Sequence, residues 1–308
     1  MDSISQPVVV LPSEAAIVLV MTISEGQEQA VRAALGDVTS IIRAVCFRYP
    51  DAVTTCVAGI GSQAWDRLFP GEPKPNGLHP FVELNGPAHH APSTPGDLVF
   101  HIRGQRFDLC FELAHQLTLR LDGLAVVADE LQGFRYFDER DLLGFVDGTE
   151  SPTGIEADRT AYVADGPFAG SSYLIVQRYL HDLTSWERLT VEEQERVIGR
   201  HKLSDIEIPD DKKAPDSHVA LNSITAPDGT DRQIVRENMP FGSVGSGTFG
   251  TYFIGYAADV TTIEEMLRHM FLGDPAGSNH DRILDFSTAV TGSLFFIPTI
   301  DFLDAQGG

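Results

Sequence analysis

Residues 15–23 of the chain read AAIVLVMTI, and residues 26–47 read GQEQAVRAALGDVTSIIRAVCF. The first run is uniformly apolar and has the length of a buried β-strand. In the second, apolar residues recur at helical spacing, at Val31, Leu35, Val38, Ile41, Ile42 and Val45. The pattern predicts a strand followed by one helix, and therefore a fold that mixes α and β structure.

The rest of the chain continues to alternate strands and helices, in a similar order in each of its two halves. In the first half, strands are expected at 53–60, 97–103 and 124–134, and helices at 63–68 and 107–121. Residues 70–95 are rich in Pro and Gly and predict a long loop. In the second half, strands are expected at 172–180, 233–237, 251–257 and 292–298, and helices at 183–186, 191–199 and 263–272. The repeated element order predicts a duplicated α+β unit joined within 138–170.

Composition narrows the class of protein. The 308 residues are 43% hydrophobic and 21% charged, which is typical of a folded globular chain. The 22 basic and 44 acidic residues give a net charge of −22. This excess of carboxylates disfavours nucleic acid and membrane surfaces as partners and favours cations. The three cysteines match no zinc-site spacing, and no basic leader or membrane-length apolar run is present, so a cytoplasmic location is expected.

The segment Leu143 to Thr153, LGFVDGTESPT, carries the clearest functional signal. Taken alone, Asp147 before a glycine indicates only a turn. However, five further segments follow it in order: IGRHKL at 198–203, DSHV at 216–219, IVRENMPFG at 234–242, HDRILDFS at 280–287 and TGSLFF at 291–296.

Together these segments resemble the dye-decolorizing peroxidase family, whose signature is GxxDG, and are most similar to its bacterial short-loop, class B-like branch. The resemblance implies two ferredoxin-like domains with antiparallel sheets, residues 1–150 ending in the GxxDG segment and residues 151–308 holding haem b. No CxxCH motif is present, so the haem is expected to be held without a covalent bond.

The resemblance assigns the iron ligand among ten histidines, which composition alone cannot do. The DSHV segment implies that His218 is the proximal ligand. Its other ring nitrogen should donate to a carboxylate, because a buried anion increases the electron donation of the ligand. The position within HDRILDF makes Asp281 the first candidate and Asp285 the alternative.

The resemblance also implies the residues on the opposite side of the haem. Asp147 is expected to move the peroxide proton, and Arg236 to stabilise the charge that develops on the leaving oxygen. Asn238 lies two residues further on the same face of an extended strand and is expected to be their polar neighbour. Arg200 is similar to a residue that pairs with a haem propionate, and Gly148 and Phe253 are expected at the cofactor.

Two other signals have simpler explanations. Residues 245–250 satisfy GxGxxG, but they run into a β-rich segment and do not open a helix, which indicates a hairpin connection and not a dinucleotide site. Glu150, Glu207 and Asp231 could form a cation site near the haem edge, but a solvated acidic surface is the simpler explanation.

The predicted function is reduction of hydrogen peroxide coupled to one-electron oxidation of dyes, phenolic compounds or Mn(II), in a homo-oligomer. The alternative from another class is a haem-binding protein for storage, transfer or iron release. A chlorite-dismutase-like lyase is a second alternative, against which the GxxDG aspartate argues.

Overall fold

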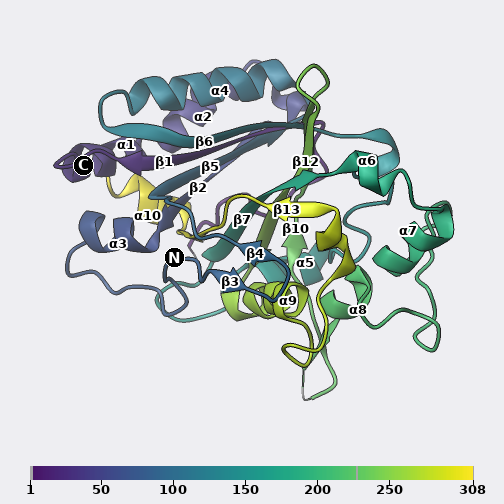
Figure 1. Ribbon diagram of the computed structural model, residues 1–308. Helices are drawn as coiled ribbons and strands as arrows, with labels where there is room; N and C mark the ends of the chain where they lie inside the picture. The colour runs from purple at the N-terminus through teal and green to yellow at the C-terminus, as the bar shows by residue number, and fades with distance from the viewer. Residues whose placement is uncertain (1–2, 227, 308) are drawn as a thin grey trace.

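The computed structural model describes residues 3–226 and 228–307 (Figure 1). The first half contains β1 (Ala15–Ile23), β2 (Thr55–Gly61), β5 (Leu98–Gly104) and β6 (Ala125–Phe134). These strands pair antiparallel in the order β2-β5-β1-β6. The first strand thus lies between the third and fourth, and the second strand pairs with the third.

The second half repeats this arrangement. Its strands are β7 (Ser172–His181), β10 (Val235–Arg236), β11 (Met239–Ser243), β12 (Thr248–Ala257) and β14 (Ser293–Ile297). Here β7 lies between β12 and β14, and both β10 and β11 pair with β12. The two halves therefore share one ferredoxin-like topology, and the duplication expected from the element order is confirmed.

A strand pair joins the halves into one sheet. Phe295 and Phe296 of β14 pair with Gly61 and Ile60 of β2, so ten strands form a continuous antiparallel sheet. Because the sheet crosses from one half to the other, strand pairing does not mark the end of a domain. The division of the chain at residue 150 stays a prediction.

The sheet buries both of its faces. Alternate residues of a strand point to opposite sides of the sheet. On β1, Ile17 and Leu19 point to one side and belong to a core that includes the helices of both halves. Val18 and Val20 instead belong to a second core with residues of β12 such as Tyr252. The inner faces of the two halves therefore pack against each other, and most helices lie outside.

The helices that the sequence predicts are present, with local differences in their bounds, and they cover the outer faces of the sheet (Figure 1). Helices α2 (Val38–Cys46) and α4 (Phe107–Arg120) pack together over the first half, and α9 (Val260–Leu272) packs on β7 and β12 (Figure 1). The other expected helices are α3 (Ser62–Leu68), α6 (Leu183–Trp186) and α7 (Val191–Ile198). No helix in the described part of the chain is long and apolar enough to cross a bilayer.

The prediction of a single helix over 26–47 is wrong, because two helices occupy this segment. Helix α1 (Glu28–Gly36) ends at a glycine, and α2 begins after Asp37. A Cβ at Gly36 would lie 2.3 Å from the backbone nitrogen of Gly307, so the close approach of a distant segment requires glycine there. Glycine and aspartate are also poor helix formers, which favours a break at this point.

Several short elements were not expected from the sequence. The predicted loop over 70–95 contains the paired strands β3 (Leu84–Asn85) and β4 (His90–Ala91). The others lie mainly around the second half: η1 (Pro50–Ala52), η2 (Phe137–Glu139), α5 (Gly154–Ala161), α8 (His218–Asn222), β8 (Ile224–Thr225), β9 (Asp231–Arg232), η3 (Arg282–Asp285), β13 (Ser287–Ala289) and α10 (Ile300–Asp304). The GxGxxG segment lies at the β11–β12 hairpin, as predicted.

Candidate active site

A cavity of about 450 Å³ opens on the helix-bearing face of the second half. Its walls come from the loop over 141–150, from β7, β10 and β12, and from α8, α9 and η3. The apolar part of the lining includes Phe145, Ile198, Ile234, Phe253, Met266 and Leu267. A volume of this size and a largely apolar wall are typical of cofactor sites.

His218 faces this cavity and is held by a buried carboxylate. Its Nδ1 lies 2.6 Å from Oδ2 of Asp281, whose side chain is fully buried. The other oxygen, Oδ1, accepts the backbone N–H of Ile283 at 3.0 Å and so caps η3. The carboxylate is therefore fixed from both sides, and it orients the imidazole. Asp285, the alternative partner, contacts other histidines.

The start of α8 sets the position of His218. Ser217 is the N-cap and accepts the backbone N–H of Ala220, and His218 is the first helical residue. Asn222 lies one turn later on the same helix face, where its Nδ2 donates to the carbonyl of His218 at 2.7 Å and lies 3.3 Å from Oδ2 of Asp281. Burial lowers the pKa of His218, but the Asp281 carboxylate outweighs burial and the net shift is upward.

Asp147 and Asn238 form a second pair on the cavity wall. Nδ2 of Asn238 donates to both carboxylate oxygens of Asp147, at 3.0 and 3.2 Å. Oδ1 of Asn238 accepts the backbone N–H of Ile254 at 3.1 Å, which fixes the direction of the amide. The Asp147 backbone N–H donates to the carbonyl of Glu139, so the turn that carries the aspartate is held as well.

Arg236 lines the same cavity beside this pair. Its backbone N–H donates to Oγ of Ser151 at 3.2 Å, and its position in β10 pairs with Gly255 of β12. Within residues 3–226 and 228–307, its guanidinium has no hydrogen bond or ion pair to a side chain. The cavity therefore holds a half-buried cation whose donors can serve a bound molecule.

Arg200 lies at the cavity edge and is nearly buried, with 8% of its side chain exposed. Nη1 donates to the carbonyl of Asp205 at 2.6 Å, and Nη2 pairs with Glu150 and lies 3.6 Å from Glu207. Lys213 also pairs with Glu207. Two of the three acids considered as a cation site are thus neutralised by basic side chains, and the propionate role of Arg200 stays a prediction.

Gly148 and Phe253 also line the cavity. Gly148 has φ +81°, a conformation that glycine adopts without strain, and it lets the chain turn directly after Asp147. Phe253 alternates with the buried Tyr252 and Ile254 of β12 and so points from the opposite face of the strand. All eight residues predicted for the site, from Asp147 to Asp281, therefore lie at the cavity or directly behind its wall.

Three further polar residues line the cavity or its wall and were not predicted from the sequence. Asn222 could have been found from its spacing of four residues after His218. Oδ1 of Asp141 accepts the N–H of Phe145 at 3.0 Å, and burial, followed by the charge of Asp147, raises the pKa of Asp141 to about 7. His181 contacts Oγ of Ser287 and Oγ1 of Thr251, and burial lowers its pKa to about 4. No sequence pattern singles out the last two, because burial creates their properties.

The donor set suits a haem group. A histidine whose Nδ1 is held by a carboxylate presents its other nitrogen as a metal ligand, and the carboxylate strengthens that ligand. The apolar wall suits a porphyrin ring, and a free guanidinium with a fixed carboxylate suits a small polar molecule beside it. The residues present therefore fit the cofactor expected from the sequence.

Comparisons with known proteins agree over nearly the full chain. The family model described as "Dyp-type peroxidase, N-terminal" matches residues 6–135, and the model "Dyp-type peroxidase, C-terminal" matches residues 138–302. A dye-decolorizing peroxidase of Rhodococcus erythropolis is 58% identical over 310 residues, which cover 99% of this chain and 89% of the relative.

Solved structures give the same result. The encapsulated DyP-type peroxidase from Mycobacterium smegmatis has a TM-score of 0.95 and 54% identity, over 98% of each chain. A variant of DypB from Rhodococcus jostii RHA1, solved in complex with heme, has a TM-score of 0.95 and 51% identity, also over 98% of each chain. The chain is therefore an enzyme, a peroxidase, and belongs to the Dyp-type peroxidase family.

Proposed function

We propose that the cavity holds haem b, ligated by His218, and that Asp147 and Arg236 act there on hydrogen peroxide. The observation that carries this assignment is that three polar groups with different hydrogen-bond partners face one cavity. These are a histidine tied to a buried carboxylate, a carboxylate tied to an amide, and a guanidinium without a partner among the described side chains. Bound haem b supplies the iron at which peroxide is reduced and to which a reducing substrate then gives up single electrons.

Asp147 is the group that can move a proton. Heterolytic cleavage of peroxide requires that a proton leave one oxygen and arrive on the other. The Asp147 carboxylate lines the cavity and can accept a proton directly or through a water. Asn238 donates to both Asp147 oxygens and so holds the carboxylate in one orientation. Asn238 is therefore proposed as a positioning residue.

Arg236 supplies a fixed positive charge. A guanidinium keeps its proton at any working pH, so it cannot exchange protons with peroxide. It can stabilise the negative charge that develops on the leaving oxygen, because its donors are already in place when that charge forms. The remaining proposed contacts are Arg200 toward a haem propionate, with Gly148 and Phe253 against the ring.

The net charge bears on the choice of reductant. We propose that dyes, phenolic compounds or Mn(II) supply the electrons, and the net charge of −22 favours cationic members of these classes. A cytoplasmic location and a homo-oligomer are also proposed. An encapsulated relative from Mycobacterium smegmatis supports the idea of assembly. A haem store or carrier is not favoured, because the similar proteins reported above are peroxidases.

The assignment of His218 is tested by haem retention. In His218→Ala the purified protein should lose most of its Soret absorbance after gel filtration, because the cavity then offers no imidazole to the iron. His115→Ala, on the exposed surface of α4, is the matched control and should keep the wild-type spectrum. Full haem occupancy with an unchanged spectrum in the His218 variant would contradict the proposal.

A further inference from the structure

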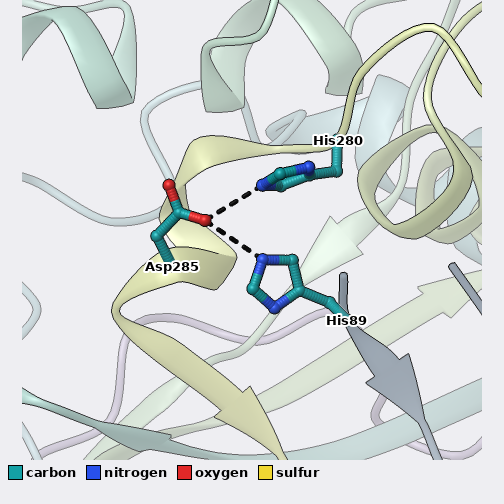
Figure 2. Close-up of side chains that lie close together, drawn as sticks. All are labelled: His89, His280 and Asp285. Carbon is teal, nitrogen blue, oxygen red and sulfur yellow. Dashed lines mark hydrogen bonds and ion pairs between the residues drawn. The ribbon is translucent and has the colours of Figure 1, made fainter. Parts of the chain in front are cut away.

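A second group of ligating side chains lies outside the cavity. Nε2 of His89 and Nε2 of His280 lie 3.1 and 3.0 Å from the same oxygen, Oδ1 of Asp285 (Figure 2). One potential ligand atom from each residue lies within 4.8 Å of the other two. The three side chains are 22%, 27% and 31% exposed, so the point they surround is open to solvent.

The backbone brings these residues together from two distant segments. His89 lies in the turn between β3 and β4, where its carbonyl accepts the N–H of Gly86. A Cβ at Gly86 would lie 2.1 Å from the carbonyl oxygen of Phe271, so the turn sits tightly against the end of α9. His280 precedes η3, and Asp285 is its last residue. The convergence is therefore built by packing and does not depend on flexible side chains alone.

Asp285 has one oxygen available. Its Oδ2 accepts the side-chain Nε–H of Arg282 at 2.6 Å, whereas Oδ1 faces both imidazole rings. A carboxylate oxygen placed between two imidazole rings is a donor type that divalent transition metals bind. Arg282 acts on the far oxygen as an orienting partner of the ligand.

The geometry points to a site for a divalent transition metal of the zinc class, and we propose that His89, His280 and Asp285 are its three protein ligands. Zinc binds imidazole nitrogen at about 2.0–2.1 Å and carboxylate oxygen at about 2.0–2.2 Å. Tetrahedral ligands at those lengths are roughly 3.3–3.5 Å apart. The observed nitrogen-to-oxygen distances need to open by only a few tenths of an ångström, and solvent supplies the fourth ligand.

The site has a structural consequence that is separate from peroxide chemistry. Bound metal would tie the β3–β4 turn to η3, whose N-cap is Asp281, the residue that holds His218. Binding to the folded protein alone raises its stability by mass action. Zinc should therefore raise the unfolding temperature of the haem-loaded protein by roughly 2–5 °C at saturating concentration.

The test is calorimetric titration of the haem-loaded protein with ZnCl₂. We expect one equivalent per chain with the wild type, and an affinity loss of at least about 10- to 100-fold in the double variant His89→Ala/His280→Ala and in Asp285→Asn. The matched control is His90→Ala, because His90 is adjacent in sequence but pairs with Glu83. An unchanged Soret band shows that the variants keep their fold.

Two results would overturn the proposal. One is wild-type zinc affinity in the double variant, and the other is no zinc binding by the wild type at about 1 mM, the weak limit for a specific site. Crystals of the wild-type enzyme soaked in ZnCl₂ give a second measurement that needs no variant. An anomalous peak at the zinc edge between the three side chains supports the site, and a peak found only elsewhere refutes it.

Discussion

Arg236 and Asp147 line the same cavity, but we propose that they act differently in peroxide cleavage. Arg236 supplies a fixed positive charge, and Asp147 transfers a proton. Loss of a fixed charge typically costs about 10²–10³ in rate, and loss of a positioned base about 10²–10⁴, so magnitude alone does not separate them. We expect Arg236→Leu to be the more damaging change. Water can relay a proton in a wet cavity, but it cannot replace a fixed cation.

The pH dependence separates the two roles. Stopped-flow measurement of the peroxide-dependent change in the haem spectrum should show slow reaction in both variants. In Asp147→Asn the acid limb of the rate profile should disappear, because no carboxylate remains to be protonated. In Arg236→Leu the limb should remain. A wild-type rate in Arg236→Leu would remove Arg236 from the mechanism.

Asp141 makes stability depend on pH. Its pKa is raised to about 7, above the value of about 3.9 expected in the unfolded chain. Between these values the folded protein binds more protons, so the free energy of unfolding falls as pH rises from about 4 to about 7. Asp141→Asn keeps an acceptor for the Phe145 N–H and removes this effect.

The corresponding measurement is urea unfolding of the haem-free protein at pH 5 and pH 8. Relative to the wild type, Asp141→Asn should gain roughly 1–3 kcal/mol on going from the lower to the higher pH. Glu112→Gln, on the exposed face of α4, serves as the control and should show no such gain. Parallel pH profiles for wild type and Asp141→Asn would disprove the assignment.

How far single residues can be predicted depends on how local their chemistry is. The DSHV and GxxDG segments led to His218 and Asp147 because each motif is contiguous in sequence. The contact between His218 and Asp281 spans 63 residues, and only the family pattern suggested it. Asp141 and His181 escaped notice because their properties arise from burial, which no local pattern encodes.

At the scale of elements, β12 connects the strands that line the cavity, because it pairs with β7 on one side and with β10 and β11 on the other. At Gly250, a Cβ would lie 1.9 Å from the carbonyl oxygen of Tyr179 in β7. Gly250→Ala should therefore push the two strands apart and cost about 1–3 kcal/mol of stability.

Thermal unfolding of the haem-loaded protein checks this expectation. The unfolding temperature of Gly250→Ala should fall by several degrees. Gly245→Ala is the control, because a Cβ at Gly245 meets nothing within 4 Å in the same hairpin. Equal unfolding temperatures for both variants would show that β12 can move away from β7 without cost.

Helices and strands were predicted well where apolar periodicity is strong. They were predicted poorly where their bounds depend on contacts with distant segments or where they are very short. The buried strand β1 and the amphipathic helix α9 were expected from their patterns. The break between α1 and α2 was missed, because it depends on the approach of Gly307 to Gly36. Helix α8 has five residues, too few for periodicity to reveal it, although it carries His218.

For the molecule as a whole, net charge should control access by charged reductants. With a net charge of −22, kcat/KM for a cationic dye should fall severalfold between about 10 mM and about 200 mM NaCl, because salt screens the attraction. For an anionic dye of similar potential it should rise. Steady-state rates at constant pH provide the measurement, and the same salt dependence for both dyes would exclude electrostatic steering.

The pairing of β14 with β2 also governs how the protein can be made. Of the strands in the ten-stranded sheet, β14 comes last in chain order, so during synthesis β2 and residues 172–176 of β7 keep open edges until residues 293–297 have emerged. Unpaired edges in an apolar sheet invite pairing between chains. We therefore expect nascent chains to need chaperone protection late in translation, and a premature stop before residue 293 to yield aggregate and not a folded half.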